Sequence, residues 1–73
     1  MITRMNEKKP TLKEAQKIVG GYVELVKLAN GDQLYCDEDG ISKGLGLNRE
    51  ASVLAGRPIV GDVLILSGTA RWE

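Results

Sequence analysis

Apolar residues at helical intervals predict a short helix near the start of the chain, over residues 11–19. Thr11 is followed three residues later by Glu14, which is the spacing of a capping box. Gly20 and Gly21 can take the left-handed conformation that ends a helix. Residues 1–9 are polar and show no period, so we expect a disordered N-terminal arm. The apolar stripe of the helix consists of Leu12, Ala15, Ile18 and Val19.

A second short helix is expected to begin after Asn48 and to run to about Ala55. The Asn48 side chain can cap its N-terminus, and Gly56 ends it. The first helix spans about two turns, so tertiary packing must hold it.

Three extended segments complete the pattern, over residues 22–28, 33–37 and 59–66. Asn30-Gly31 separates the first two and favours a type I′ hairpin, in which both central residues need positive φ. The expected order is α-β-β-α-β. It predicts an α+β fold with a three-stranded, mainly antiparallel sheet and two short helices, as one domain over residues 10–67. Residues 68–73 are expected to be a C-terminal tail.

The extended segments are apolar on both faces, which raises the question of what covers them. Residues 59–66 alternate between two apolar faces, and residues 22–28 carry one charge on each face, Glu24 and Lys27. Such strands need cover on both sides, and we expect two short helices to cover one side. The other side would then be left without cover, which predicts that a second subunit buries it in a symmetric homodimer. Alternatively, the N-terminal arm and Trp72 fold back over it.

Composition narrows the classes of function. Ten basic and ten acidic residues balance in this chain of 73, so the whole molecule does not attract nucleic acid or an anionic membrane. Histidine is absent, and the single cysteine, Cys36, cannot form an internal disulfide. Cys36 is expected to be a small buried hydrophobe. We therefore expect no enzymatic activity, no metal, no cofactor and a reducing, cytoplasmic location.

The glycine-rich segment before the second helix is the candidate site for an anion. Glycines allow a close approach of the backbone, and a helix N-terminus and a basic side chain favour negative charge. The alternative is a tight, packed loop in which Asn48 simply caps the helix. The candidate anion-binding residues are Gly44, Gly46, Asn48 and Arg49.

Acidic residues occur at two notable places. Residues 37–39 are expected to form an exposed acidic turn. Asp62 stands in the most apolar segment of the chain. It is expected to mark a bulge after Gly61, or to pair with Arg57 or Arg49.

Turn and packing residues between positions 20 and 66 carry a resemblance. They are Gly20-Gly21-Tyr22-Val23-Glu24, Asn30-Gly31-Asp32, Asp39-Gly40, Gly44-Leu45, Leu47-Asn48, Ala51-Ser52 and Ile59-Val60-Gly61-Asp62. In these residues the chain resembles a small domain family of unknown function, carried mainly by bacteriophages and mobile elements. The resemblance implies a fold and a genomic setting and assigns no catalytic residue. Small accessory proteins of such a setting often bind a host factor.

We therefore expect a small phage-type accessory protein that is not an enzyme and that binds and modulates a host protein as a homo-oligomer. One alternative is a protein that binds or sequesters a nucleotide or another small anion. A further alternative is nucleic-acid binding through the basic N-terminal arm. The expected partner-binding surface consists of Tyr35, Arg49, Glu50 and Arg57.

Overall fold

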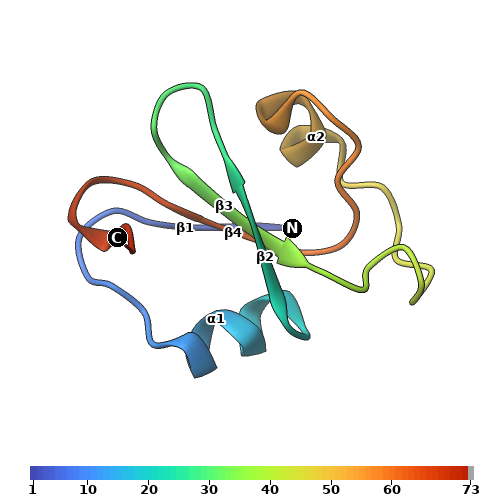
Figure 1. Cartoon of the computed structure of the whole chain (residues 1–73), viewed down its shortest axis with the longest axis horizontal. Helices are drawn as coiled ribbons and strands as arrows, with labels where there is room; N and C mark the ends of the chain where they lie inside the picture. The colour runs from blue at the N-terminus through green and yellow to red at the C-terminus, as the bar shows by residue number, and fades with distance from the viewer. Residues whose placement is uncertain (73) are drawn as a thin grey trace.

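The computed structural model describes residues 1–72 and shows a four-stranded mixed sheet between two helices (Figure 1). The strand order is β1-β4-β3-β2, in which β1 runs parallel to β4 and the other neighbours are antiparallel. The α+β class is confirmed, but the order is β-α-β-β-α-β and the sheet has a fourth strand. In chain order the elements are β1 (Ile2–Met5), α1 (Leu12–Val19), β2 (Val23–Lys27), β3 (Gln33–Asp37), α2 (Arg49–Ala55), β4 (Val63–Leu66) and the 3-10 turn η1 (Gly68–Ala70).

The fourth strand lies in the segment that we expected to be a disordered arm, so that expectation is wrong for Ile2–Met5. β1 pairs with β4 in register from Ile2 opposite Val63 to Met5 opposite Leu66. Ile2 packs on the α2 side of the sheet and Met5 on the α1 side, which anchors the strand on both faces. The partner strand lies some 60 residues away along the chain, so no local pattern announces this pairing.

The two faces of β4 are both buried, as the sequence pattern predicted. Val63 and Ile65 belong to the cluster that includes Ala51 of α2. Leu64 and Leu66 belong to the cluster that includes Ala15 of α1. Figure 1 shows α1 on one side of the sheet and α2 on the other. The expectation that both helices cover one face is therefore wrong, and the argument that a second subunit must cover the other face loses its basis.

The C-terminal segment completes the cover on the α1 side, in line with the alternative that Trp72 folds back. The Trp72 backbone N–H donates to Gln33 Oε1 at 2.8 Å, and the Gln33 amide donates to the Trp72 carbonyl. The indole Nε1 donates to the Pro10 carbonyl at 3.1 Å. Residues 68–72 of the expected tail are thus tied to β3 and to the segment before α1, while Glu73 lies outside the described residues.

The hairpin between β2 and β3 differs from the expected type I′ turn. Gly31 has a positive φ of 92°, but Asn30 does not. Leu28 N–H donates to the Asp32 carbonyl, and Gly31 N–H donates to the Leu28 carbonyl. These bonds define a three-residue loop ending in a left-handed glycine, which is the second common way to close a hairpin. The Asn30 side chain accepts from Asp32 N–H at 3.0 Å and stabilises this loop.

The last strand is shorter than the expected segment 59–66. Ahead of β4, the backbone of residues 59–61 bonds to the loop before α2: Asn48 N–H donates to the Ile59 carbonyl and Gly61 N–H to the Gly46 carbonyl. Gly61 has a φ of 79°, and a Cβ there would lie 2.7 Å from the Leu45 side chain. Glycine therefore lets the chain turn from this loop into the sheet.

Candidate functional site

The four residues expected to bind a partner do not form one surface. Tyr35 is 5% exposed and lies in the cluster under α1. Its ring meets Trp72 edge-on with centroids 4.7 Å apart, and its hydroxyl donates to Gln33 Oε1 at 3.3 Å. Burial raises the pKa of Tyr35. The prediction that Tyr35 faces a partner is wrong, because α1 and the C-terminal segment cover the face that the sequence pattern presented as polar.

The remaining three residues lie on or beside α2. Arg57 follows the helix, and its guanidinium donates to the Glu24 carboxylate on β2 at 3.1 Å. Glu50 accepts from Arg4 on β1 at 3.4 Å. These ion pairs join α2 and its exit to the two edge strands, and both are exposed pairs of small energetic weight. Arg49 is exposed on α2.

The loop before α2 is a closely bonded connection, which weakens its interpretation as an anion site. The Asn48 side chain accepts from Ala51 N–H at 3.1 Å and donates to the Gly61 carbonyl at 2.9 Å, so both its polar atoms are used. The Gly44 N–H donates to the Ile41 carbonyl, and the Gly46 carbonyl accepts from Gly61. The alternative interpretation is confirmed in one respect: Asn48 is the cap of α2.

Lys43, the other cation of this loop, is held by Asp37. Its ammonium donates to Asp37 Oδ2 at 2.6 Å and to the Gly20 carbonyl at 3.1 Å. Asp37 Oδ1 accepts from Asp39 N–H at 2.9 Å. The expectation of an exposed acidic turn is therefore wrong for Asp37, which is buried, and holds for Glu38 and Asp39. The hydrogen bond from Lys43, and then that from Asp39, holds the pKa of Asp37 below its usual value.

Replacement of Asp37 by asparagine is expected to lower the free energy of unfolding by about 1 kcal/mol at neutral pH. The effect is modest because Lys43 is partly exposed, and it depends on pH. The pKa of Asp37 is lower in the folded chain than in the unfolded one. Its contribution is therefore complete above the unfolded pKa of about 3.9 and is lost as the pH falls through the folded value. Urea denaturation of both proteins should show their unfolding free energies converging in acid. A constant difference at every pH would contradict this assignment.

Asp62 has a partner that the sequence did not suggest. Its carboxylate accepts from the Met1 ammonium at 3.0 Å, rather than from Arg57 or Arg49. This contact lies at the start of the pairing between β1 and β4, where the Met1 carbonyl accepts from Val63 N–H. Both charges are exposed, so the pair guides the position of the chain end more than it stabilises the fold.

An exposed apolar surface on α2 was not predicted from the sequence. Val53 is 82% exposed and Leu54 is 40% exposed, while Ala51 packs into the core. Beside them is a shallow hollow of about 270 Å³ between α2 and the β2–β3 hairpin. The signal was available: alanines at positions 51 and 55 share one side of the helix, which leaves the larger apolar residues to the other. The hollow is lined by Leu28, Ala29, Asn30, Val53 and Leu54.

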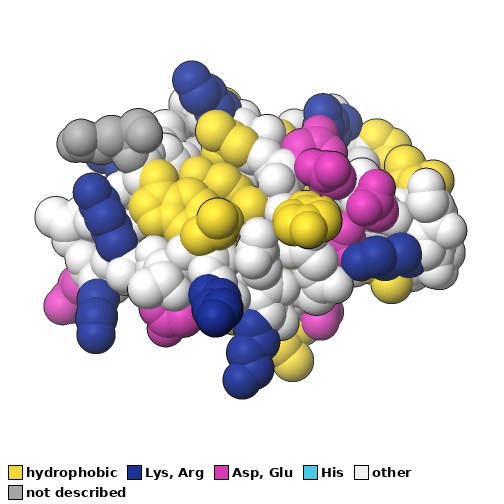
Figure 2. Space-filling model, turned by 60° about the horizontal axis from the view of Figure 1, so that its bottom comes forward, with side chains coloured by type: hydrophobic (Ala, Val, Ile, Leu, Met, Phe, Trp, Pro, Cys, Tyr) yellow, Lys and Arg dark blue, Asp and Glu magenta, His cyan; other side chains and the backbone are white. Residues whose placement is uncertain are grey.

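A second apolar patch lies on the α1 side, among lysines and arginines (Figure 2). The partly buried residues Met5, Ile18, Val23 and Trp72 pack on the cluster under this helix. Trp72 is fixed by hydrogen bonds from both its backbone and its ring, so it closes the core on this side. We therefore assign this patch to the fold.

The single cysteine of the chain lies in the core cluster on the α2 side of the sheet. Cys36 is buried, and burial raises its thiol pKa, which matches the expected role of a small hydrophobe. Among residues 1–72 there is no group of three or more histidine, cysteine, aspartate or glutamate residues that could hold a metal ion. Over the same residues, no helix has the length and apolar character to cross a membrane.

The fold and these surfaces define a small mixed-sheet α+β domain with exposed apolar residues and shallow hollows. The family model described as "Domain of unknown function (DUF3846)" matches residues 2–73, and the chain belongs to this family. No curated protein and no solved structure is significantly similar to the chain. The family match confirms the part of the resemblance that pointed to a domain family of unknown function.

Proposed function

We propose that this protein is a non-enzymatic binding protein that contacts a partner protein through α2. The contact surface, called the α2 surface below, extends from the outward side of α2 to the tip of the hairpin. The observation that carries the proposal is the exposure of Val53 and Leu54 beside a hollow. The α2 surface consists of Ala29, Asn30, Arg49, Glu50, Val53 and Leu54.

Exposed apolar residues on a short helix contribute little to the stability of the fold. Contact with a partner protein would give Val53 and Leu54 a role. A Val or Leu side chain gains about 1.5–3 kcal/mol when it is fully buried, which is energy that a partner can supply. The hollow next to Val53 and Leu54 can accept an apolar side chain of that partner. Arg49 and Glu50 would form the charged rim around this apolar centre. The α2 surface therefore has the composition of a small protein interface.

The choice of partner rests on the genomic setting that the sequence resemblance implies. The resemblance to a family carried by bacteriophages and mobile elements suggests a host protein as the binding partner and the host cytoplasm as the location. Binding to that protein is the means by which a chain of this size could modulate it. The earlier alternative of a nucleotide or other anion receives less support, because the loop before α2 uses its Asn48 and Lys43 side chains internally.

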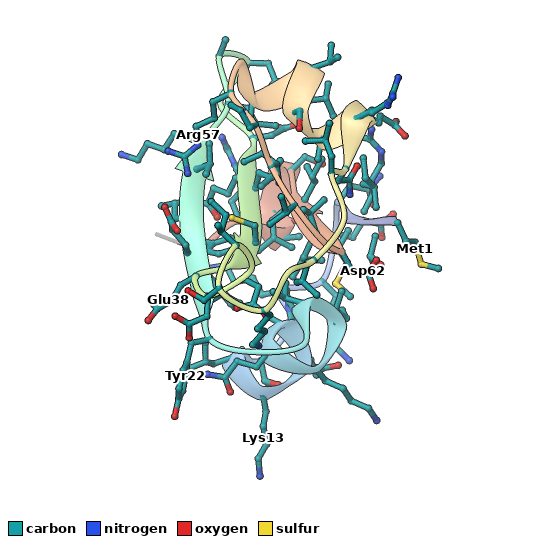
Figure 3. The ribbon with its side chains drawn as sticks, turned by 90° about the vertical axis from the view of Figure 1, so that its right-hand side faces the viewer. Met1, Lys13, Tyr22, Glu38, Arg57 and Asp62 are labelled. Carbon is teal, nitrogen blue, oxygen red and sulfur yellow. The ribbon has the colours of Figure 1, made fainter. Side chains whose placement is uncertain are left out.

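The experiment uses a photo-crosslinking amino acid in place of Val53, in extract of a bacterial host. A discrete adduct is expected, and unlabelled wild-type protein should compete with its formation while the Val53→Asp variant should not. The same probe in place of Lys13 is the matched control. Lys13 projects into solvent from the end of the molecule opposite to α2 (Figure 3). Equal adducts from both positions, or competition by Val53→Asp, would count against the α2 surface.

A further inference from the structure

Among residues 1–72, the backbone groups on the outer edge of β2 have no partner. β2 is the last strand of the sheet and has β3 as its neighbour within the described chain. Leu28 N–H donates to the Asp32 carbonyl and Glu38 N–H to the Tyr22 carbonyl, which fixes the hydrogen-bonding phase of this pair. The even-numbered residues of β2 therefore point their backbone groups at β3. The N–H and C=O groups of Val23, Leu25 and Lys27 point outward.

Exposed apolar side chains accompany these open backbone groups. Leu25 is 41% exposed in the middle of β2, and Tyr22 is 68% exposed just before it. Figure 3 shows β2 as the outermost strand, with Arg57, Glu38 and Tyr22 projecting beside it. An edge strand with free donors, free acceptors and exposed apolar residues is a site at which another strand can add.

We propose that a second copy of this chain adds to this edge, with the two β2 strands antiparallel about a two-fold axis at Leu25. Leu25 then lies opposite Leu25 of the second copy, and Val23 lies opposite its Lys27. Each of the three outward residues pairs with an outward residue, so every open backbone group of the strand finds a partner. The two sheets form one continuous sheet with both α1 helices on the same face.

The charges of β2 select this register among those that the symmetry allows. Outward residues must pair with outward residues. The second strand can therefore shift only by two residues at a time, and each such shift is one step. One step in one direction places Glu24 opposite Glu24, and two steps in the other place Lys27 opposite Lys27. The intermediate register pairs Val23 with Ala29, which lies in the hairpin loop beyond β2. The register about Leu25 uses the whole strand and places no like charges opposite each other.

Arg57 already pairs with the Glu24 carboxylate that lies next to the axis. Its guanidinium is 3.1 Å from the Glu24 carboxylate, and it balances the charge that each copy brings to the axis. Glu24 lies opposite Val26 of the second copy in this register.

Because five-residue strands bury a small area, the dimer is expected to be weak and to dissociate on dilution. The dimer uses a different surface from α2, so its failure would leave the proposed function untouched.

The test is sedimentation equilibrium over a dilution series, with a charge exchange at position 25. The wild type is expected to be a dimer at high concentration and a monomer at low concentration. Leu25→Glu and Leu25→Lys should each weaken the dimer by about tenfold or more, because like charges meet at the axis. An equimolar mixture of the two variants should associate again, since opposite charges then face each other.

Two controls keep the result interpretable. Lys27→Ala leaves the backbone groups of the edge in place and should still dimerise. Circular dichroism and thermal unfolding should show that both Leu25 variants are folded. A wild type that stays monomeric at every concentration would overturn the proposal and leave the edge to an extended segment of another protein. A dimer that persists in Leu25→Glu would overturn it as well.

Discussion

Replacement of Leu64 by alanine is expected to lower the free energy of unfolding by about 3 kcal/mol. Leu64 is fully buried in the central strand β4, where it packs with Leu66 and with Ala15 and Val19 of α1. Truncation removes three carbon atoms and leaves a cavity that the rigid sheet cannot close. A chain of this size has a total stability of roughly 4–11 kcal/mol, so the loss is a large part of the whole.

Urea denaturation followed by circular dichroism measures this loss. Val53→Ala is the matched control, because Val53 is exposed on α2 and its truncation should change the stability by less than about 0.5 kcal/mol. A similar loss in the two variants would contradict the assignment of Leu64 to the core and of Val53 to the surface.

Replacement of Asn48 by alanine is expected to cost about 2 kcal/mol, which is more than the loss of a helix cap alone. The side-chain oxygen caps α2 by accepting from Ala51 N–H, a contribution of about 1 kcal/mol. The side-chain nitrogen donates to the Gly61 carbonyl at 2.9 Å and joins the loop before α2 to the segment before β4. The second bond contributes a further ~1 kcal/mol.

The variant Asn48→Asp separates the two contributions. It keeps an oxygen for Ala51 N–H and loses the donor to Gly61, so it should remain capped and still be less stable than the wild type. The same denaturation experiment applies. If Asn48→Asp were as stable as the wild type, the bond to Gly61 would carry no weight. If it were as unstable as Asn48→Ala, the cap would carry none.

The helices and β3 could be predicted from the sequence because their signals are local. Thr11 and Glu14 form both bonds of the capping box, at 3.1 and 2.9 Å, and Gly20 ends α1 in the left-handed conformation. These hydrogen bonds lower the pKa of Glu14. Asn48 and Gly56 bound α2 in the same way. Each signal depends on residues within four positions of one another, which is the range that a sequence pattern covers.

The features that could not be predicted depend on long-range contacts. β1 has few residues and pairs in parallel with a strand at the other end of the chain, so no turn marks it. Tyr35 alternates with Leu34 and Cys36, which indicated a solvent-facing side, yet α1 and Trp72 cover that side. The cover depends on the placement of the two helices on opposite faces. Short amphipathic helices carry no local signal for that choice.

The same placement explains why the candidate surfaces changed. With both faces of the sheet closed, a homodimer is no longer required to bury apolar residues. The contact surfaces that we propose instead are the edge strand β2 and the exposed side of α2. Arg49 and Glu50 stay in the proposed surface because they lie on this helix, and Tyr35 leaves it because it is part of the core.

The central claim is that a single chain closes both faces of its sheet, with β1 as a structural strand. Residue-resolved amide hydrogen exchange tests this claim most directly. The Leu25→Glu variant is used because its dimer is expected to be weakened, so the exchange reports on a single chain. Val63 N–H donates to the Met1 carbonyl and Ser67 N–H to the Met5 carbonyl across the β1–β4 pair. We predict that both amides exchange as slowly as the core amides of β4. Exchange of Val63 and Ser67 at the rate of an unstructured peptide would contradict the claim.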